Sequence, residues 1–149
     1  MAEIFFYHLT ESTLEDALPA LLEKSIARGW KVVVQTGSEE RRDALDGHLW
    51  TYRDDSFLGH GLASEPHASD QPILLTTADD NRNDAKVRFF VDGASPCALD
   101  GYERAIFMFD GHDQPQVEAA RVHWRDMKAG GHSVAYWQQG EGRRWEKKA

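Results

Sequence analysis

Three cations lie close together near the end of the sequence: Arg121, Arg125 and Lys128. Their spacing of four and three residues would place them on one face of a helix, about one turn apart. Trp124 adjoins that face. Guanidinium groups can grip a carboxylate through two hydrogen bonds at once, so the row predicts a cradle for a negatively charged ligand. The ordinary alternative is that cations near a helix end only complement the helix dipole.

The strand expected after this helix, residues 132–138, would add Val134 and Tyr136 beside the cations. With Trp124 these side chains could shape an apolar pocket, which suits a ligand with negative charge next to a hydrophobic anchor. The chain as a whole has 17 basic and 25 acidic residues and a net charge of −8. Such a field repels the phosphate backbone of DNA. The row therefore favours an acidic peptide over nucleic acid.

A second group of candidate binding residues surrounds the expected end of another helix. Trp50 closes that helix, and Phe57 and Leu58 follow in an otherwise polar stretch, residues 51–71, which we expect to be a loop. Exposed aromatic and aliphatic residues of this type are typical interface anchors. Trp50 could equally hold its own helix against the sheet.

The sequence offers no recognisable catalytic, cofactor-binding or metal-binding motif. The first expected strand–helix turn, residues 8–12, has no glycine and places a carboxylate where a phosphate would sit. The seven histidines form no HxxxH or HxH pair, and the single cysteine, Cys97, has no CxxC partner. A lone cysteine is typically a small packing residue. We therefore predict no catalytic residue, no cofactor and no metal.

Apolar runs and helical periodicity alternate along the chain. The expected helices begin at Thr10–Thr13, at Ser38 and at Gln114, and the first and last of them end near Arg28 and Ala129. The expected strands are residues 3–8, 31–36, 73–77, 87–91, 105–110 and 132–138.

This alternation predicts an α/β fold: a single three-layer α/β/α sandwich with a mostly parallel sheet, Rossmann-like but without a nucleotide-binding loop. We assign residues 1–139 to one domain and residues 140–149 to a flexible tail. No apolar run approaches the roughly 20 residues that span a bilayer. The chain shows no signal peptide, and its one cysteine agrees with a cytoplasmic location.

Several short motifs, in order along nearly the whole chain, resemble the chi subunit family of DNA polymerase III. They are Phe5-Phe6-Tyr7, Leu49-Trp50 followed by Ser56-Phe57-Leu58-Gly59-His60, Pro72-Ile73-Leu74-Leu75, and Arg121 with Trp124-Arg125 before Tyr136-Trp137. Each motif is weak alone. The block around residues 49–60 and the ending around residues 121–137 are together fairly specific.

The resemblance implies a subunit that is not an enzyme by itself: an adaptor of the clamp loader in DNA replication. It implies binding of the acidic C-terminal tail of single-stranded-DNA-binding protein, with DNA reached only indirectly. Arg121, Trp124 and Arg125 match the tail-binding motif. Lys128, Val134 and Tyr136 are their expected neighbours.

The resemblance also implies docking to a clamp-loader subunit, psi or an equivalent. Trp50 and Phe57 match the aromatic residues on that side, and Leu58 adjoins them. Two other hypotheses stay open. One is a small nucleotide-binding enzyme on the same fold. The other is direct binding of single-stranded DNA through the basic and aromatic residues 143–148, a composition typical of such binding.

Overall fold

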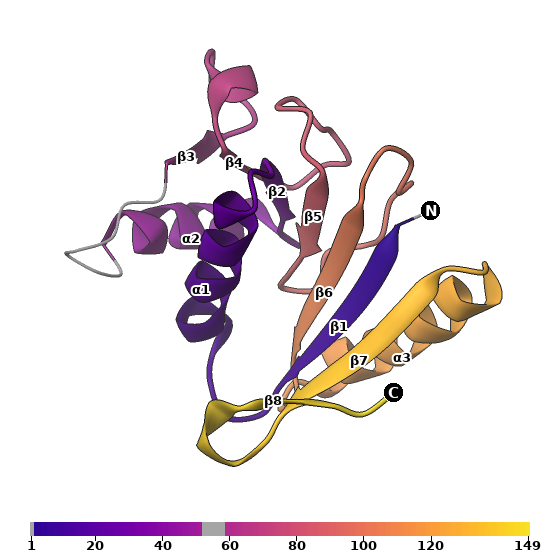
Figure 1. Cartoon of the computed structure of the whole chain (residues 1–149). Coiled ribbons are helices and arrows are strands. Elements are labelled where there is room, and N and C mark those ends of the chain that lie inside the picture. The colour runs from indigo at the N-terminus through magenta and orange to yellow at the C-terminus, as the bar shows by residue number, and fades with distance from the viewer. Residues whose placement is uncertain (1, 52–58) are drawn as a thin grey trace.

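Alternating apolar strands and amphipathic helices assemble into three layers around one mixed sheet (Figure 1). This computed structural model describes residues 2–51 and 59–149. The helices in these ranges are α1 (Leu14–Ala27), α2 (Glu39–Thr51) and α3 (Gln114–Ala129), with 3₁₀ turns at Ala68–Asp70 and Glu141–Arg143. The strands are β1 (Glu3–Leu9), β2 (Val32–Gln35), β3 (His60–Leu62), β4 (Ile73–Thr76), β5 (Val87–Phe90), β6 (Arg104–Asp110), β7 (Ser133–Gln139) and β8 (Trp145–Lys147).

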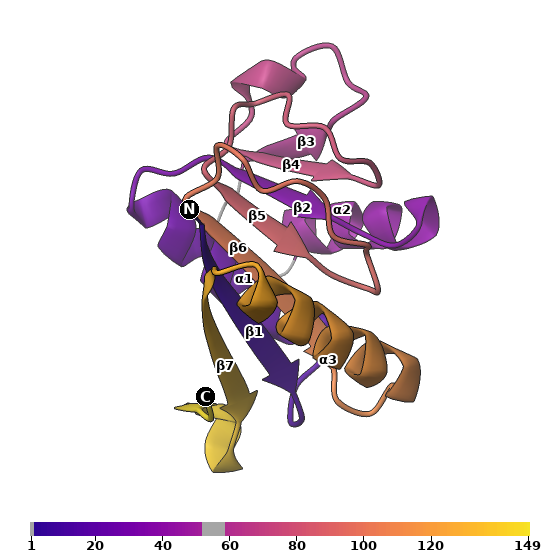
Figure 2. The same cartoon turned by 90° about the vertical axis from the view of Figure 1, so that its right-hand side faces the viewer.

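The eight strands lie in the order β3-β4-β2-β5-β6-β1-β7-β8. All neighbouring pairs are parallel except β7 and β8, which are antiparallel. Helices α1 and α2 lie on one face, and α3 lies on the other (Figures 1 and 2). The predicted α/β sandwich with a mostly parallel sheet is confirmed.

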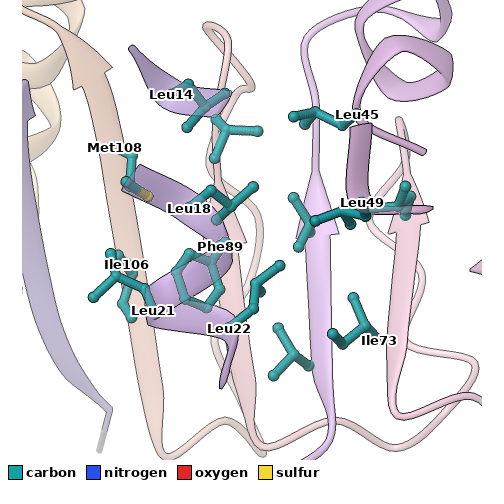
Figure 3. Close-up of a cluster of buried hydrophobic side chains, with 14 of the residues drawn as sticks. Leu14, Leu18, Leu21, Leu22, Leu45, Leu49, Ile73, Phe89, Ile106 and Met108 are labelled. Carbon is teal, nitrogen blue, oxygen red and sulfur yellow. The ribbon is translucent and has the colours of Figure 1, made fainter. Parts of the chain in front are cut away.

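The main core lies between the sheet and helices α1 and α2. Leucines at three- and four-residue steps on α1 bury the stripe that their spacing predicts. Figure 3 shows Leu18 and Leu22 of α1 near Phe89, with Leu49 of α2 alongside. Strand residues alternate between the two faces, and on the other face Ile4 and Phe6 pack in a second cluster beneath α3.

Helix ends follow the expected caps. The side chain of Thr13 accepts a hydrogen bond from the Asp16 amide at 3.2 Å, and Ser38 accepts one from the Arg41 amide at 3.2 Å. Gly29 closes α1 with a φ of +83°, a conformation that glycine adopts without strain.

Pro19, inside α1, has no amide hydrogen to donate to the carbonyl of Glu15, one turn earlier. His48 of α2 lies with Nε2 at 2.8 Å from that carbonyl. Because a carbonyl only accepts, Nε2 is the donor. An ion pair between Arg41 and the Glu15 carboxylate joins the same two helices. Together these contacts fix α2, the helix that carries Trp50.

Two segments differ from the expectation. The stretch of residues 51–71, expected to be a loop, contains β3 and a 3₁₀ turn. Within the expected tail of residues 140–149, β8 pairs with β7 and places Trp145 opposite Gln139. Both strands are three residues long, too short to produce a readable alternation of apolar and polar residues.

Candidate functional site

Helix α3 carries its three cations on the side that faces solvent. Arg121, Arg125 and Lys128 are all exposed. Arg125 Nε donates one long hydrogen bond, 3.5 Å, to the carbonyl of Arg121. Within residues 2–51 and 59–149, none of the three forms an ion pair with a carboxylate. Their donors therefore remain available to an outside acceptor.

Trp124 joins this cationic face to the sheet. Its ring packs edge-to-face against Phe6 and against Tyr136, each with a centroid distance of 5.7 Å. The Lys128 ammonium lies 5.5 Å from the Trp124 centroid, a cation–π distance. Trp124, Val134 and Tyr136 are all half-buried and pack against one hydrophobic cluster. The α3–β7 surface, as we call these three residues with the three cations, thus combines charge with a partly exposed apolar floor.

A histidine that the sequence analysis did not select, His8, belongs to the same surface. Its Nδ1 lies 2.7 Å from the hydroxyl of Tyr136, and its ring is 4.8 Å from that of Phe109. The signal was available, because His8 follows Ile4 and Phe6 at steps of two and so shares their face of β1. The sequence places His8 at the end of the first expected strand, where its contact with Tyr136 leaves no local signal.

The electrostatics of this pair depend on burial and on Arg121. Burial raises the pKa of the Tyr136 hydroxyl, and the positive charge of Arg121 partly opposes that rise. Burial lowers the pKa of His8; Arg121 and His112 reinforce this effect, and Asp110 opposes it. At neutral pH His8 and Tyr136 therefore form a neutral hydrogen-bonded pair, and the positive charge of the surface comes from α3.

The second candidate surface is described only in part. Phe57 and Leu58 lie outside the described residues. Trp50 is 53% exposed, and its ring lies 4.3 Å from that of His60. His60 is itself buried, with Nε2 3.1 Å from the Asp46 carboxylate. His60 falls in the stretch expected to be a loop, and it is instead a buried link between β3 and α2.

The β1–α1 turn has an internal acceptor at the place where related folds hold a phosphate. Gln139 Oε1 accepts from the amides of Thr10, Glu11 and Ser12 at 3.2, 3.1 and 3.1 Å. Gln139 is only 5% exposed, and its amide nitrogen donates to Ser12 Oγ at 2.7 Å. Since three amide donors of the turn are already satisfied, the turn is poorly suited to bind an anion.

The remaining chemistry of the described residues is limited. Burial raises the pKa of the Cys97 thiol, which disfavours the reactive thiolate at neutral pH. In residues 2–51 and 59–149 no group of three or more His, Cys, Asp or Glu side chains is arranged to hold a metal. No helix of these ranges is long and apolar enough to cross a bilayer.

Comparison with known proteins agrees with the resemblance seen in the sequence. Residues 1–135 match the family model described as DNA polymerase III chi subunit, HolC. The chain is 31% identical over 87 residues to the probable DNA polymerase III subunit chi of Rickettsia prowazekii, across 58% of the chain and 53% of that protein. It thus matches about half the length of that relative. It is 29% identical over 115 residues to DNA polymerase III subunit chi of Pseudomonas aeruginosa, across 76% of the chain and 78% of that protein.

Proposed function

The chain belongs to the DNA polymerase III chi subunit family, and from that premise we propose that it is a non-catalytic adaptor of replication. Its α3–β7 surface would bind the acidic C-terminal tail of single-stranded-DNA-binding protein. The observation that carries this proposal is the row Arg121, Arg125 and Lys128, exposed beside a half-buried aromatic floor. On a chain of net charge −8, such a row favours an acidic partner.

The tail that we propose carries carboxylates and ends in phenylalanine, so it presents charge next to a hydrophobic anchor. Its carboxylates would meet Arg121 and Arg125, whose forked donors suit bidentate contacts. Its terminal ring would rest against Trp124 and Tyr136, where aromatic pairs favour edge-to-face contact. Part of the attraction acts across an exposed surface, so binding should weaken as salt rises.

The second half of the proposal is the link to the clamp loader. Trp50, with Phe57 and Leu58 of the segment outside the described residues, would dock psi or an equivalent subunit. An exposed tryptophan is a typical anchor of protein interfaces, and Trp50 is 53% exposed. In this scheme the adaptor reaches DNA only indirectly, in the cytoplasm where replication takes place.

The alternative of a nucleotide-binding enzyme has less support. It needs free amides at the first strand–helix turn, and three of these amides donate to Gln139. A saturable screen with ATP and NAD would test it separately. Direct binding of single-stranded DNA through residues 143–148 is opposed by the net charge of −8, which repels the phosphate backbone.

The test of tail binding is a calorimetric titration with a synthetic acidic peptide that ends in Pro-Phe. Arg121→Ala and Arg125→Ala should each weaken binding by about 1–3 kcal/mol, since each removes a charged hydrogen-bond donor. Lys86→Ala is the matched control, because Lys86 is an exposed cation on another part of the surface. If both arginine variants bind like Lys86→Ala, the tail does not bind at the α3–β7 surface.

A further inference from the structure

Among the helices of residues 2–51 and 59–149, only α3 packs closely on the pair of parallel strands β1 and β7. Helix α3 contacts both strands from its side of the sheet, whereas α1 contacts β2 and β6 on the other side (Figures 1 and 2). Parallel strands are usually covered on both faces. Two strands span about 10 Å, which is roughly the diameter of one helix. The uncovered face beside α1 thus has the width of one missing helix.

A groove of about 490 Å³ occupies this place. Its apolar lining includes Tyr7 of β1, Trp137 of β7 and Trp145 of β8. The Tyr7 and Trp145 rings meet edge-to-face at 4.8 Å. Because successive residues of a strand point to opposite faces, Trp137 lies on the side opposite Tyr136. The groove is therefore separate from the α3–β7 surface.

The groove is positively charged on an acidic protein. Lys24 and Arg28 of α1 and Arg104 of β6 line it, and none of its lining residues carries a carboxylate. The closest described carboxylate to a groove cation is that of Glu3, whose Oε1 is 3.8 Å from Arg104. At that distance the contact is at the outer limit of an ion pair. The charge of the groove complements an acidic occupant.

The two guanidinium groups are held in place by aromatic rings. Arg104 Cζ lies 4.5 Å from the Phe5 centroid and 5.2 Å from that of Trp30. Arg28 Cζ lies 4.7 Å from the same Trp30 ring. Stacking restricts the rotamers of both arginines before any ligand arrives, which lowers the entropy lost on binding.

Two buried donors of the groove lining have no acceptor among the described residues: Arg104 Nε and Trp137 Nε1. Buried N–H groups nearly always have a partner, and an unsatisfied one is costly. Both atoms are donors with almost no exposed surface, so an acceptor such as a carboxylate oxygen reaches them only when the groove lining shifts around an occupant.

We propose that this groove docks an acidic amphipathic helix of a partner protein, lying beside α1 and covering β1 and β7. Its apolar stripe packs on Tyr7 and Trp137, and its carboxylates meet Lys24, Arg28 and Arg104. A nucleic-acid strand fits less well. Bases need open ring faces to stack on, whereas the Tyr7 and Trp145 rings are half-buried and pack edge-to-face.

The test uses two fluorescent synthetic helices of about 18 residues, roughly 27 Å long, with the same Leu/Phe stripe. One has glutamates and the other lysines along the flanks. Anisotropy with the full chain should show the acidic helix binding at least about tenfold more tightly, a difference of about 1.4 kcal/mol. In ¹⁵N spectra the indole N–H signal of Trp137, assigned with Trp137→Phe, should move downfield as it gains an acceptor.

The double variant carries Lys24→Glu and Arg28→Glu, and the control variant carries Lys86→Glu. All three residues are exposed. The double reversal should remove the preference for the acidic helix, and the control should keep it. Equal binding of both helices, no binding of either, or an unchanged preference in the double variant would overturn the proposal. Binding of a labelled oligothymidine that the double reversal abolishes, without binding of the acidic helix, would overturn it in favour of nucleic acid.

Discussion

Arg88 and the two arginines of α3 lie in opposite environments. Arg88 of β5 is fully buried, and its three nitrogens donate five hydrogen bonds inside the chain. The acceptors are Gln35 Oε1, the Tyr102 hydroxyl and the carbonyls of Ala78 and Asp80. Arg121 and Arg125 of α3 are exposed and have no carboxylate partner among the described residues.

The difference separates a cation that is bonded inside the fold from cations whose donors can reach a partner. A buried cation whose donors are all bonded inside the fold stabilises that fold, because each of its buried acceptors would otherwise lack a partner. An exposed cation whose donors have no partner inside the chain should affect the affinity for a ligand more than the stability of the fold. A similar contrast separates two sets of N–H donors. In the β1–α1 turn Gln139 accepts from three amides, whereas the groove donors Arg104 Nε and Trp137 Nε1 have no acceptor among the described residues.

The largest expected effect is on Arg88. Arg88→Ala leaves four internal acceptor groups without their donor and opens a cavity, so it should lower the free energy of unfolding by about 3–5 kcal/mol. Arg88→Met, which keeps more of the volume, should lose less. Urea unfolding measures both. If Arg88→Ala is as stable as wild type, Arg88 does not have the structural role described. If the variant is folded but no longer binds the acidic peptide, Arg88 affects binding as well, and the comparison also fails.

The next effect is on Gln139. Gln139→Ala removes the acceptor of three turn amides, and we expect a loss of about 2 kcal/mol in the free energy of unfolding. Gln138→Ala is the matched control, since Gln138 is a half-buried neighbour on the same strand. The two variants should separate clearly in thermal unfolding. Equal stability would mean that the turn does not depend on its internal acceptor.

The smallest expected effect is the pH dependence of stability that comes from His8, a half-buried residue. Its pKa is lowered in the folded chain, chiefly by burial. The unfolded chain therefore takes up a proton first as pH falls below about 6.5, so this contribution to stability is present above that pH and is lost below it. His123, whose pKa burial also lowers, acts in the same direction.

Unfolding curves between about pH 7.5 and pH 5 measure that dependence. His8→Gln should flatten it while His123 keeps part of the slope. An unchanged slope in His8→Gln would show that the His8 ring is as accessible to protons in the folded chain as in the unfolded one.

Periodicity and caps predicted most of the elements because long amphipathic helices and apolar strands leave clear patterns. Helix α3 was placed at residues 114–129, the bounds that the structure gives. The patterns could not predict the strand order or β8, since pairing partners far apart in the chain leave no local signal. The same limit hid Gln139, which bonds to a turn 127–129 residues away.

The candidate site also contains a part that local spacing predicted and a part that depends on strand pairing. The cations and Trp124 share one helix, so their spacing alone brought them together. His8 reaches Tyr136 only because β1 and β7 are neighbours, 128 residues apart in sequence at that contact. The groove beside α1 was not predicted, because its residues come from α1, β1, β6, β7 and β8.

The central claim is that the cations of α3 hold the free carboxylate end of an acidic tail. The most direct measurement is a thermodynamic cycle: wild type and Arg125→Ala, each titrated with the Pro-Phe peptide in its free-acid and amidated forms. We predict that amidation weakens binding to wild type and has a smaller effect on Arg125→Ala, with a coupling energy of about 1–3 kcal/mol. Equal losses on amidation in both proteins, or no binding of either peptide at low salt, would contradict the account.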